Sequence, residues 1–155
     1  MSLKQTIQDD FKAALLSGDR FRGEVLNAIK SAVLYEEIAS KKREAGLSDS
    51  EIENVIAREV KKRKESASIY LENNRKEAAD QELKEAAIME GYLPEKISEA
   101  ELIKKIDDKI KELEVSDIKG MGKVIGALKS ELGSAVDGKL LSDKVDRKST
   151  RLNSS

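Results

Sequence analysis

The segment 120–126 of this 155-residue chain has the residue types and spacing that suit the binding of an anion. Three glycines there leave room beside the backbone, Lys119 and Lys123 add positive charge, and the segment lies near an expected helix N-terminus. The same spacing has a second interpretation, in which Gly122 and Gly126 lie one helical turn apart and admit a neighbouring helix. The second interpretation is favoured by the sequence, because no strand precedes the segment and it lacks the Gly-Lys-Ser/Thr ending of a P-loop.

A run of four cations, residues 61–64, is the other basic feature of the chain. Consecutive residues of a helix point about 100° apart, so these side chains cannot form one flat patch. Glu59 and Glu65 flank the run, which favours a solvated, ion-paired helix face over a phosphate site. Arg63, together with Arg75, is therefore a secondary candidate for contacting phosphate.

The chain has no histidine and no cysteine, which excludes thiolate nucleophiles, Ser-His-Asp triads and zinc-finger ligand sets. Sites built from carboxylates alone, such as an acid–base pair or a magnesium site, remain possible. No pair of carboxylates has a spacing that singles it out, so we expect no catalytic residue, no metal site and no cofactor. The carboxylates considered for magnesium are Glu77, Asp80, Glu85, Asp107 and Asp108.

The overall charge is close to neutral, with 29 Lys+Arg, 30 Asp+Glu and a formal net charge of −1. A protein that binds nucleic acid through its total charge is strongly basic, so any such binding here requires a local patch. No apolar run is long enough to cross a bilayer, and no signal-peptide pattern begins the sequence. These features, with the absence of cysteine, predict a cytoplasmic protein that does not enter a membrane.

The apolar residues recur at helical spacing throughout, and no alternating strand pattern appears. Ser2, Ser48 and Ser98 each precede a Glu or Gln by three residues, which is a helix-start signal. Pro94, the only proline, forces the residue before it out of the helical region and marks a boundary. We therefore predict an all-α fold, with a helical N-terminal domain over residues 1–93 and a three-helix C-terminal domain over residues 94–146.

Residues 147–155 have no apolar periodicity, so the last helix is expected to span only about two turns. The amino-acid sequence of these residues resembles the translated read-through of a sequencing adapter, so we expect a non-native tail. A genuine disordered tail is the alternative.

Several short blocks, in order along residues 1–145, resemble the YqeY-like family. Its C-terminal domain, the GatB/YqeY domain, is shared with the B subunit of the Asp/Glu-tRNA amidotransferase. Each block is a weak signal alone, and the combination is specific. The blocks are Asp19-Arg20, residues 25–30, residues 62–66, Asn74-Arg75, Tyr92-Leu93-Pro94, residues 121–128 and residues 137–140.

The resemblance implies an association with tRNA in translation and, at the level of the family, glutamine-dependent carbon–nitrogen ligase activity. Amide transfer needs a nucleophile that releases ammonia and a site that activates ATP, and neither is recognisable here. We therefore expect a non-catalytic tRNA-associated accessory protein rather than an amidotransferase component. The expected phosphate contacts are Lys119, Lys123, Lys129 and Lys139, followed by Arg63 and Arg75, with close backbone approach at Gly122 and Gly126.

A docking module is the alternative, which would bind an aminoacyl-tRNA synthetase or an amidotransferase subunit through an apolar groove expected between the two domains. Relatives commonly carry several cations before the Asp137-Gly138 turn, whereas residues 129–136 here hold one cation and one anion. This difference predicts RNA binding that is weak or that needs a partner. The sequence does not determine the oligomeric state.

Overall fold

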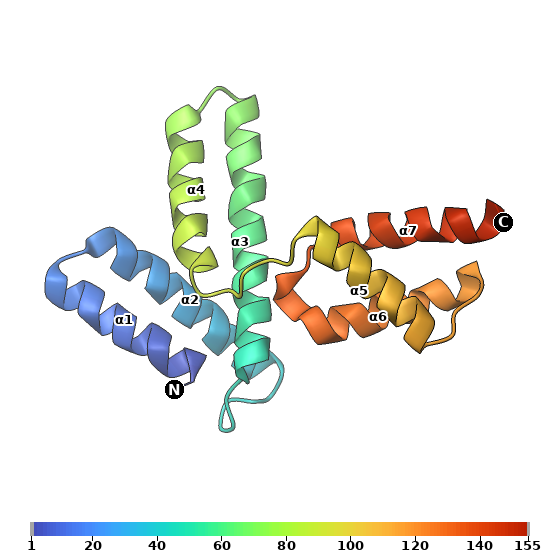
Figure 1. Cartoon of the computed structure of the whole chain (residues 1–155). Coiled ribbons are helices and arrows are strands. Elements are labelled where there is room, and N and C mark those ends of the chain that lie inside the picture. Colours follow the sequence, from blue (N-terminus) through green and yellow to red (C-terminus); the bar gives the residue numbers. More distant parts are fainter. Residues whose placement is uncertain (1, 155) are drawn as a thin grey trace. The chain divides into compact units, whose positions relative to one another are not determined.

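The computed structural model describes residues 2–154, with side chains as far as residue 148. The chain divides into two compact units, Met1–Leu93 and Pro94–Ser155 (Figure 1). The predicted all-α fold is confirmed, since the described residues form seven α-helices and two short 3₁₀ helices and contain no strand.

The N-terminal unit consists of two helical hairpins, which Figure 1 shows in blue and in green. The first joins α1 (Leu3–Ser17) to α2 (Arg20–Ala39), and the second joins α3 (Asp49–Glu72) to α4 (Lys76–Glu90). Apolar stripes of the four helices meet in one core, because burying such a stripe stabilises a helix more than its intrinsic propensity does. Fully buried members of the core include Leu26, Ile29, Ile52, Ile56 and Met89.

The predicted helix starts are present and have the expected local hydrogen bonds. The hydroxyl oxygen of Ser2 accepts from the backbone N–H of Gln5 at 3.1 Å, and that of Ser98 accepts from the backbone N–H of Glu101 at 3.2 Å. Gly18 ends α1 with a left-handed φ of 76°, a conformation that costs glycine little. The serine caps depend on residues within a turn of one another, which is why the sequence predicts them.

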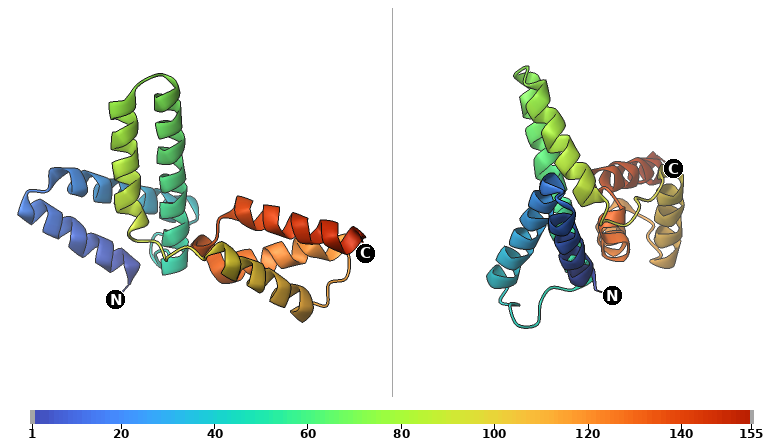
Figure 2. Two further views of the ribbon diagram at one scale, coloured as in Figure 1. Left: turned by 45° about the horizontal axis from the view of Figure 1, so that its top comes forward. Right: turned by 90° about the vertical axis from the view of Figure 1, so that its left-hand side faces the viewer.

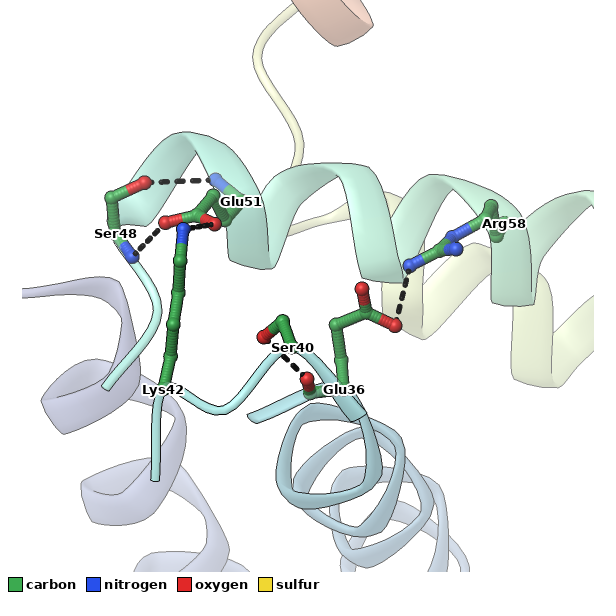
Figure 3. A network of polar contacts seen from close by, with 6 residues as sticks. All are labelled: Glu36, Ser40, Lys42, Ser48, Glu51 and Arg58. Carbon is green, nitrogen blue, oxygen red and sulfur yellow. Dashed lines mark hydrogen bonds and ion pairs between the residues drawn. The ribbon is translucent and has the colours of Figure 1, made fainter. Parts of the chain in front are cut away.

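The connection between α2 and α3 is held by polar contacts (Figure 3). The Ser48 hydroxyl accepts from the Glu51 N–H at 3.2 Å, and the Glu51 carboxylate accepts from the Ser48 N–H at 3.1 Å, a reciprocal cap. The same carboxylate pairs with Lys42 of the loop. Arg58 of α3 lies 3.4 Å from the carboxylate of Glu36 in α2. The loop is therefore fixed at both of its ends.

The C-terminal unit contains three helices, α5 (Glu99–Glu112), α6 (Met121–Leu132) and α7 (Gly138–Ser154), as Figure 2 shows from two sides. Two 3₁₀ turns, η1 (Ile118–Gly120) and η2 (Gly133–Ala135), precede and follow α6. The core of the unit lies between the three helices. Its fully buried members are Leu102, Ile106, Val124, Leu128, Leu141 and Val145.

Helix α7 is longer than the sequence predicted, since its backbone continues through residues 147–154 instead of ending after about two turns. The segment contains no glycine or proline that would stop a helix. Lys148 also pairs with Asp107 of α5 at 2.8 Å, which attaches this part of α7 to the unit. The side chains of residues 149–155, in the predicted tail, lie outside the part that the structure describes.

Candidate nucleic-acid interface

Gly122 and Gly126 lie on an open surface of α6. A Cβ atom placed on either glycine would meet no atom within 4 Å. The prediction that this pair packs against a neighbouring helix is therefore wrong, because no other helix in the described part of the chain approaches the two glycines. The backbone at these positions is accessible to a ligand, which was the other interpretation of their spacing.

Gly120, in the same segment, has the opposite environment. A Cβ there would lie 2.6 Å from Cγ1 of Val115, closer than atoms can approach without a shift. The N–H of Gly120 also donates to the Asp117 carboxylate at 3.3 Å. Of the three glycines, the first is therefore required by packing.

Two of the four candidate lysines lie beside the open glycines. Gly126 and Lys129 lie within about 60° of each other around the helix axis, with Gly122 between them, and Lys123 lies about 100° from Gly122. We call Gly122, Lys123, Gly126 and Lys129 the α6 face. Lys119 precedes this face in η1 and is also exposed.

The fourth candidate, Lys139, lies where α7 begins, close to the end of the α6 face. Cε of Lys129 is 3.8 Å from the Cβ position of Gly138, the residue before Lys139. The Asp137 carboxylate accepts from the N–H of Lys139 at 2.8 Å and caps the helix. The structure therefore brings Lys129 and Lys139 to one place, although nine other residues separate them in the sequence.

Sequence reasoning missed Lys96, which lies near the same helix start. The N–H of Ile97 donates to the carbonyl oxygen of Ala135 at 2.8 Å and draws this segment towards α7. The backbone N–H of Leu140 lowers the pKa of the Asp137 carboxyl most, and the charges of Lys96 and Lys139 lower it further. No local pattern marks Lys96, because a backbone contact between distant segments positions it.

The acidic groups of the C-terminal unit are partly engaged by other lysines. Lys109 is buried and donates hydrogen bonds to the carboxylates of Glu131 and Glu112, and the hydrogen bond to Glu131 is the main cause of its raised pKa. Lys144, also buried, pairs with Glu99. Within the described residues, by contrast, none of Lys119, Lys123, Lys129 and Lys139 forms an ion pair. Their charge is therefore available to an external anion.

The run 61–64 is an ion-paired helix face, as the favoured interpretation predicted. Arg63 lies 3.3 Å from Glu59 on its own helix and 3.8 Å from Glu85 of α4. Its Nε atom is buried and has no hydrogen-bond partner among the described residues. Lys62 pairs with Glu59 and Lys64 with Glu90. The guanidinium of Arg63 therefore braces two helices, and we leave it out of the interface.

Arg75 immediately precedes α4 and is exposed. Its guanidinium carbon lies 5.0 Å from the centre of the Tyr70 ring, an arrangement typical of a cation–π contact. Like Arg63, it belongs to the N-terminal unit and not to the α6 face.

The carboxylates considered for magnesium do not gather. Within the described residues, no three acidic side chains come close enough together to hold a metal ion. Burial raises the pKa of Glu85, and the neighbouring charge of Glu82 raises it further. Asp107 pairs with Lys148.

Among the residues that the structure describes, no helix is both long enough and apolar enough to span a membrane.

The fold and the site together define a class of protein. Its members are all-helical and have two compact units, and the second unit carries a helix face lined by lysine and glycine. The chain belongs to the YqeY-like family, whose sequence model matches residues 4–148, and the predicted family is thereby confirmed. The chain is also similar to the altered inheritance of mitochondria protein 41, mitochondrial, of Kluyveromyces lactis. The two are 28% identical over 86 residues, or 56% of this chain, which spans 45% of the relative's length.

Proposed function

We propose that this protein is a non-catalytic accessory protein of translation that binds tRNA through its C-terminal unit. The contacts are made by the α6 face, with Lys119 before it and Lys139 beyond it. A cytoplasmic location, where tRNA is used, is part of the proposal. The observation that carries it is the open surface at Gly122 and Gly126, bordered by lysines that form no ion pair with any residue the structure describes.

The geometry suits a phosphate backbone better than a compact anion. Helix α6 has 12 residues and is therefore about 18 Å long, and its two lysines, Lys123 and Lys129, lie about 9 Å apart along the axis and about 120° apart around it. Gly122 and Gly126 lie between these lysines around the axis and carry no side chains, which lets a sugar–phosphate chain approach the helix. Release of counterions from the RNA then supplies the free energy of binding.

The recognition that we propose is insensitive to base sequence. Residues 94–155 contain no Phe, Tyr or Trp, so this unit has no ring on which a base can stack. Lysine contacts to phosphates position a nucleic acid but do not read its bases. Discrimination among tRNAs would then come from shape or from a partner.

Measuring tRNA affinity against salt concentration tests the proposal. Four phosphate contacts predict that log K falls with log salt with a slope of about −3. Lys123→Glu should weaken binding and make the slope shallower by about 1. Lys104→Glu, an equal change at an exposed position of α5, serves as the control. Absence of binding at low salt, or equal losses in the two variants, contradicts the proposal.

Docking to an aminoacyl-tRNA synthetase or an amidotransferase subunit is a second candidate function. It is favoured by the exposed apolar side chains of Leu34, Tyr35 and Ile38 on adjacent turns of α2, which are 40%, 75% and 61% exposed. Direct binding to the purified synthetase or amidotransferase after nuclease treatment tests it. Leu34→Glu with Ile38→Glu should abolish that binding and leave the salt-dependent tRNA binding unchanged.

A further inference from the structure

We propose that a cavity in the N-terminal unit binds a small carboxylate with a short apolar tail. The cavity lies between α1 and α2 and has a volume of about 300 Å³. All of its lining residues belong to this unit, so the inference does not depend on the proposed RNA interface.

The inner wall of the cavity is apolar and comes from three helices. Ile7 of α1, Val33 of α2 and Ile52 of α3 line it, and each is buried. The volume is at the lower end of the range for small-molecule sites, which favours a small ligand. An apolar tail of a few carbon atoms would remove this wall from water, and each buried methylene contributes to binding.

The residues that line the cavity carry more positive than negative charge. Lys4, Lys30 and Arg43 line it, with Glu37 as the one acidic residue among the lining residues given for this cavity. Glu37 is 1% exposed, and its carboxylate accepts a 2.9 Å hydrogen bond from Lys4, which lowers the pKa of Glu37. Lys4 and Glu37 therefore neutralise each other, and the positive charge of the other two residues remains.

Lys30 and Arg43 form no ion pair within the described part of the chain. The ammonium of Lys30 lies 4.2 Å from the centre of the Phe11 ring, whose face stabilises a cation without supplying a negative charge. Two positively charged residues in the lining of a largely apolar cavity favour an anion over a cation. Of the small anions, a carboxylate on an apolar chain fits both the charge and the wall.

Titration of the full-length, methyl-labelled protein with hexanoate, followed by NMR, tests the inference. We expect saturable shifts of the Ile7, Val33 and Ile52 methyl signals. Lys30→Gln and Arg43→Gln should each weaken binding at least five-fold. The control Lys12→Gln, an equal change on α1 outside the cavity, should leave the affinity unchanged. Circular dichroism verifies that each variant is folded.

Hexanol and hexylammonium, titrated in the same way, separate charge recognition from simple filling of the cavity. We expect hexanol to bind at least five-fold more weakly than hexanoate and hexylammonium to cause no saturable shift. Equal binding of hexanol, preference for hexylammonium, or no saturable shift with hexanoate overturns the inference. None of these results bears on the tRNA proposal, because the two sites share no residue.

Discussion

The hydroxyl group of Tyr92 donates a 2.6 Å hydrogen bond to the carboxylate of Asp10, a residue 82 positions earlier in the chain. Arg22 of α2 donates to the same hydroxyl oxygen at 3.4 Å. Tyr92 follows α4 and comes two residues before Pro94, and its ring packs against the core of the N-terminal unit. This contact therefore attaches the end of the N-terminal unit to α1 and α2.

Tyr92→Phe should remove an alkaline loss of stability. Burial and the hydrogen bond to Asp10 raise the pKa of Tyr92 from 10.0 to about 12. Between these pH values the native state binds more protons than the unfolded state, so the free energy of unfolding falls as pH rises. Urea unfolding across that range should show this fall in the wild type and a smaller fall in Tyr92→Phe. At neutral pH the variant should be less stable by about 1 kcal/mol. An equal alkaline fall in both proteins would show that other groups cause it.

Glu37→Gln should change stability in acid. The hydrogen bond from Lys4 lowers the pKa of Glu37 below its usual 4.5. The unfolded state therefore binds more protons as pH falls below that value, so the stabilisation by Glu37 is present above it and is lost as pH falls through the native pKa. We expect Glu37→Gln to cost about 1 kcal/mol at neutral pH, because Lys4 is half exposed, and less in acid. Urea unfolding at several pH values measures the difference, and a pH-independent cost would contradict the prediction.

Gly126→Ala and Gly120→Ala should have opposite effects on stability. A methyl group at Gly126 meets nothing within 4 Å and removes the entropic cost of glycine in a helix, so we expect a gain of about 0.5–1 kcal/mol. At Gly120 the methyl group meets Val115 at 2.6 Å, and we expect a loss of about 1–3 kcal/mol. Thermal unfolding of the two variants measures both changes. A loss at Gly126 would mean that its surface is covered.

A larger side chain at Gly126 should separate stability from RNA binding. Gly126→Leu adds bulk to the open surface without removing a charge, so it should keep the C-terminal unit folded while weakening tRNA binding at least five-fold. Gly126→Ala is the matched control, with a smaller effect on affinity. Filter binding at fixed salt measures both, and unchanged affinity in Gly126→Leu would exclude backbone approach at this position.

Arg63→Met should affect stability and not RNA binding. The substitution keeps much of the apolar stem but removes the positive charge between Glu59 and Glu85, whose side chains are 17% and 25% exposed. We expect a loss of about 1–2 kcal/mol, because two partly buried carboxylates lose their partner. Urea unfolding measures the loss, and the salt dependence of tRNA binding should be unchanged. A shallower salt dependence of tRNA binding in Arg63→Met would show instead that Arg63 contacts the RNA.

The sequence by itself determined the helices and most of their ends. The cap formed by Ser48 and Glu51 and the left-handed Gly18 depend on contacts within a single turn, and the apolar stripes depend on the 3.6-residue period. The end of α7 was predicted less well. An absence of apolar periodicity does not stop a helix that lacks glycine and proline.

Only the tertiary structure decided which charges are available. Helical periodicity shows which face of a helix is apolar, but it does not show which carboxylate of another helix arrives opposite a given cation. Glu85 of α4 therefore engages Arg63, and Glu131 of α6 engages Lys109, while Lys123 remains without an ion pair in the described part of the chain. In the same way, the spacing of Gly122 and Gly126 suits a packed or an open helix equally, and only the positions of the neighbouring helices make this surface open.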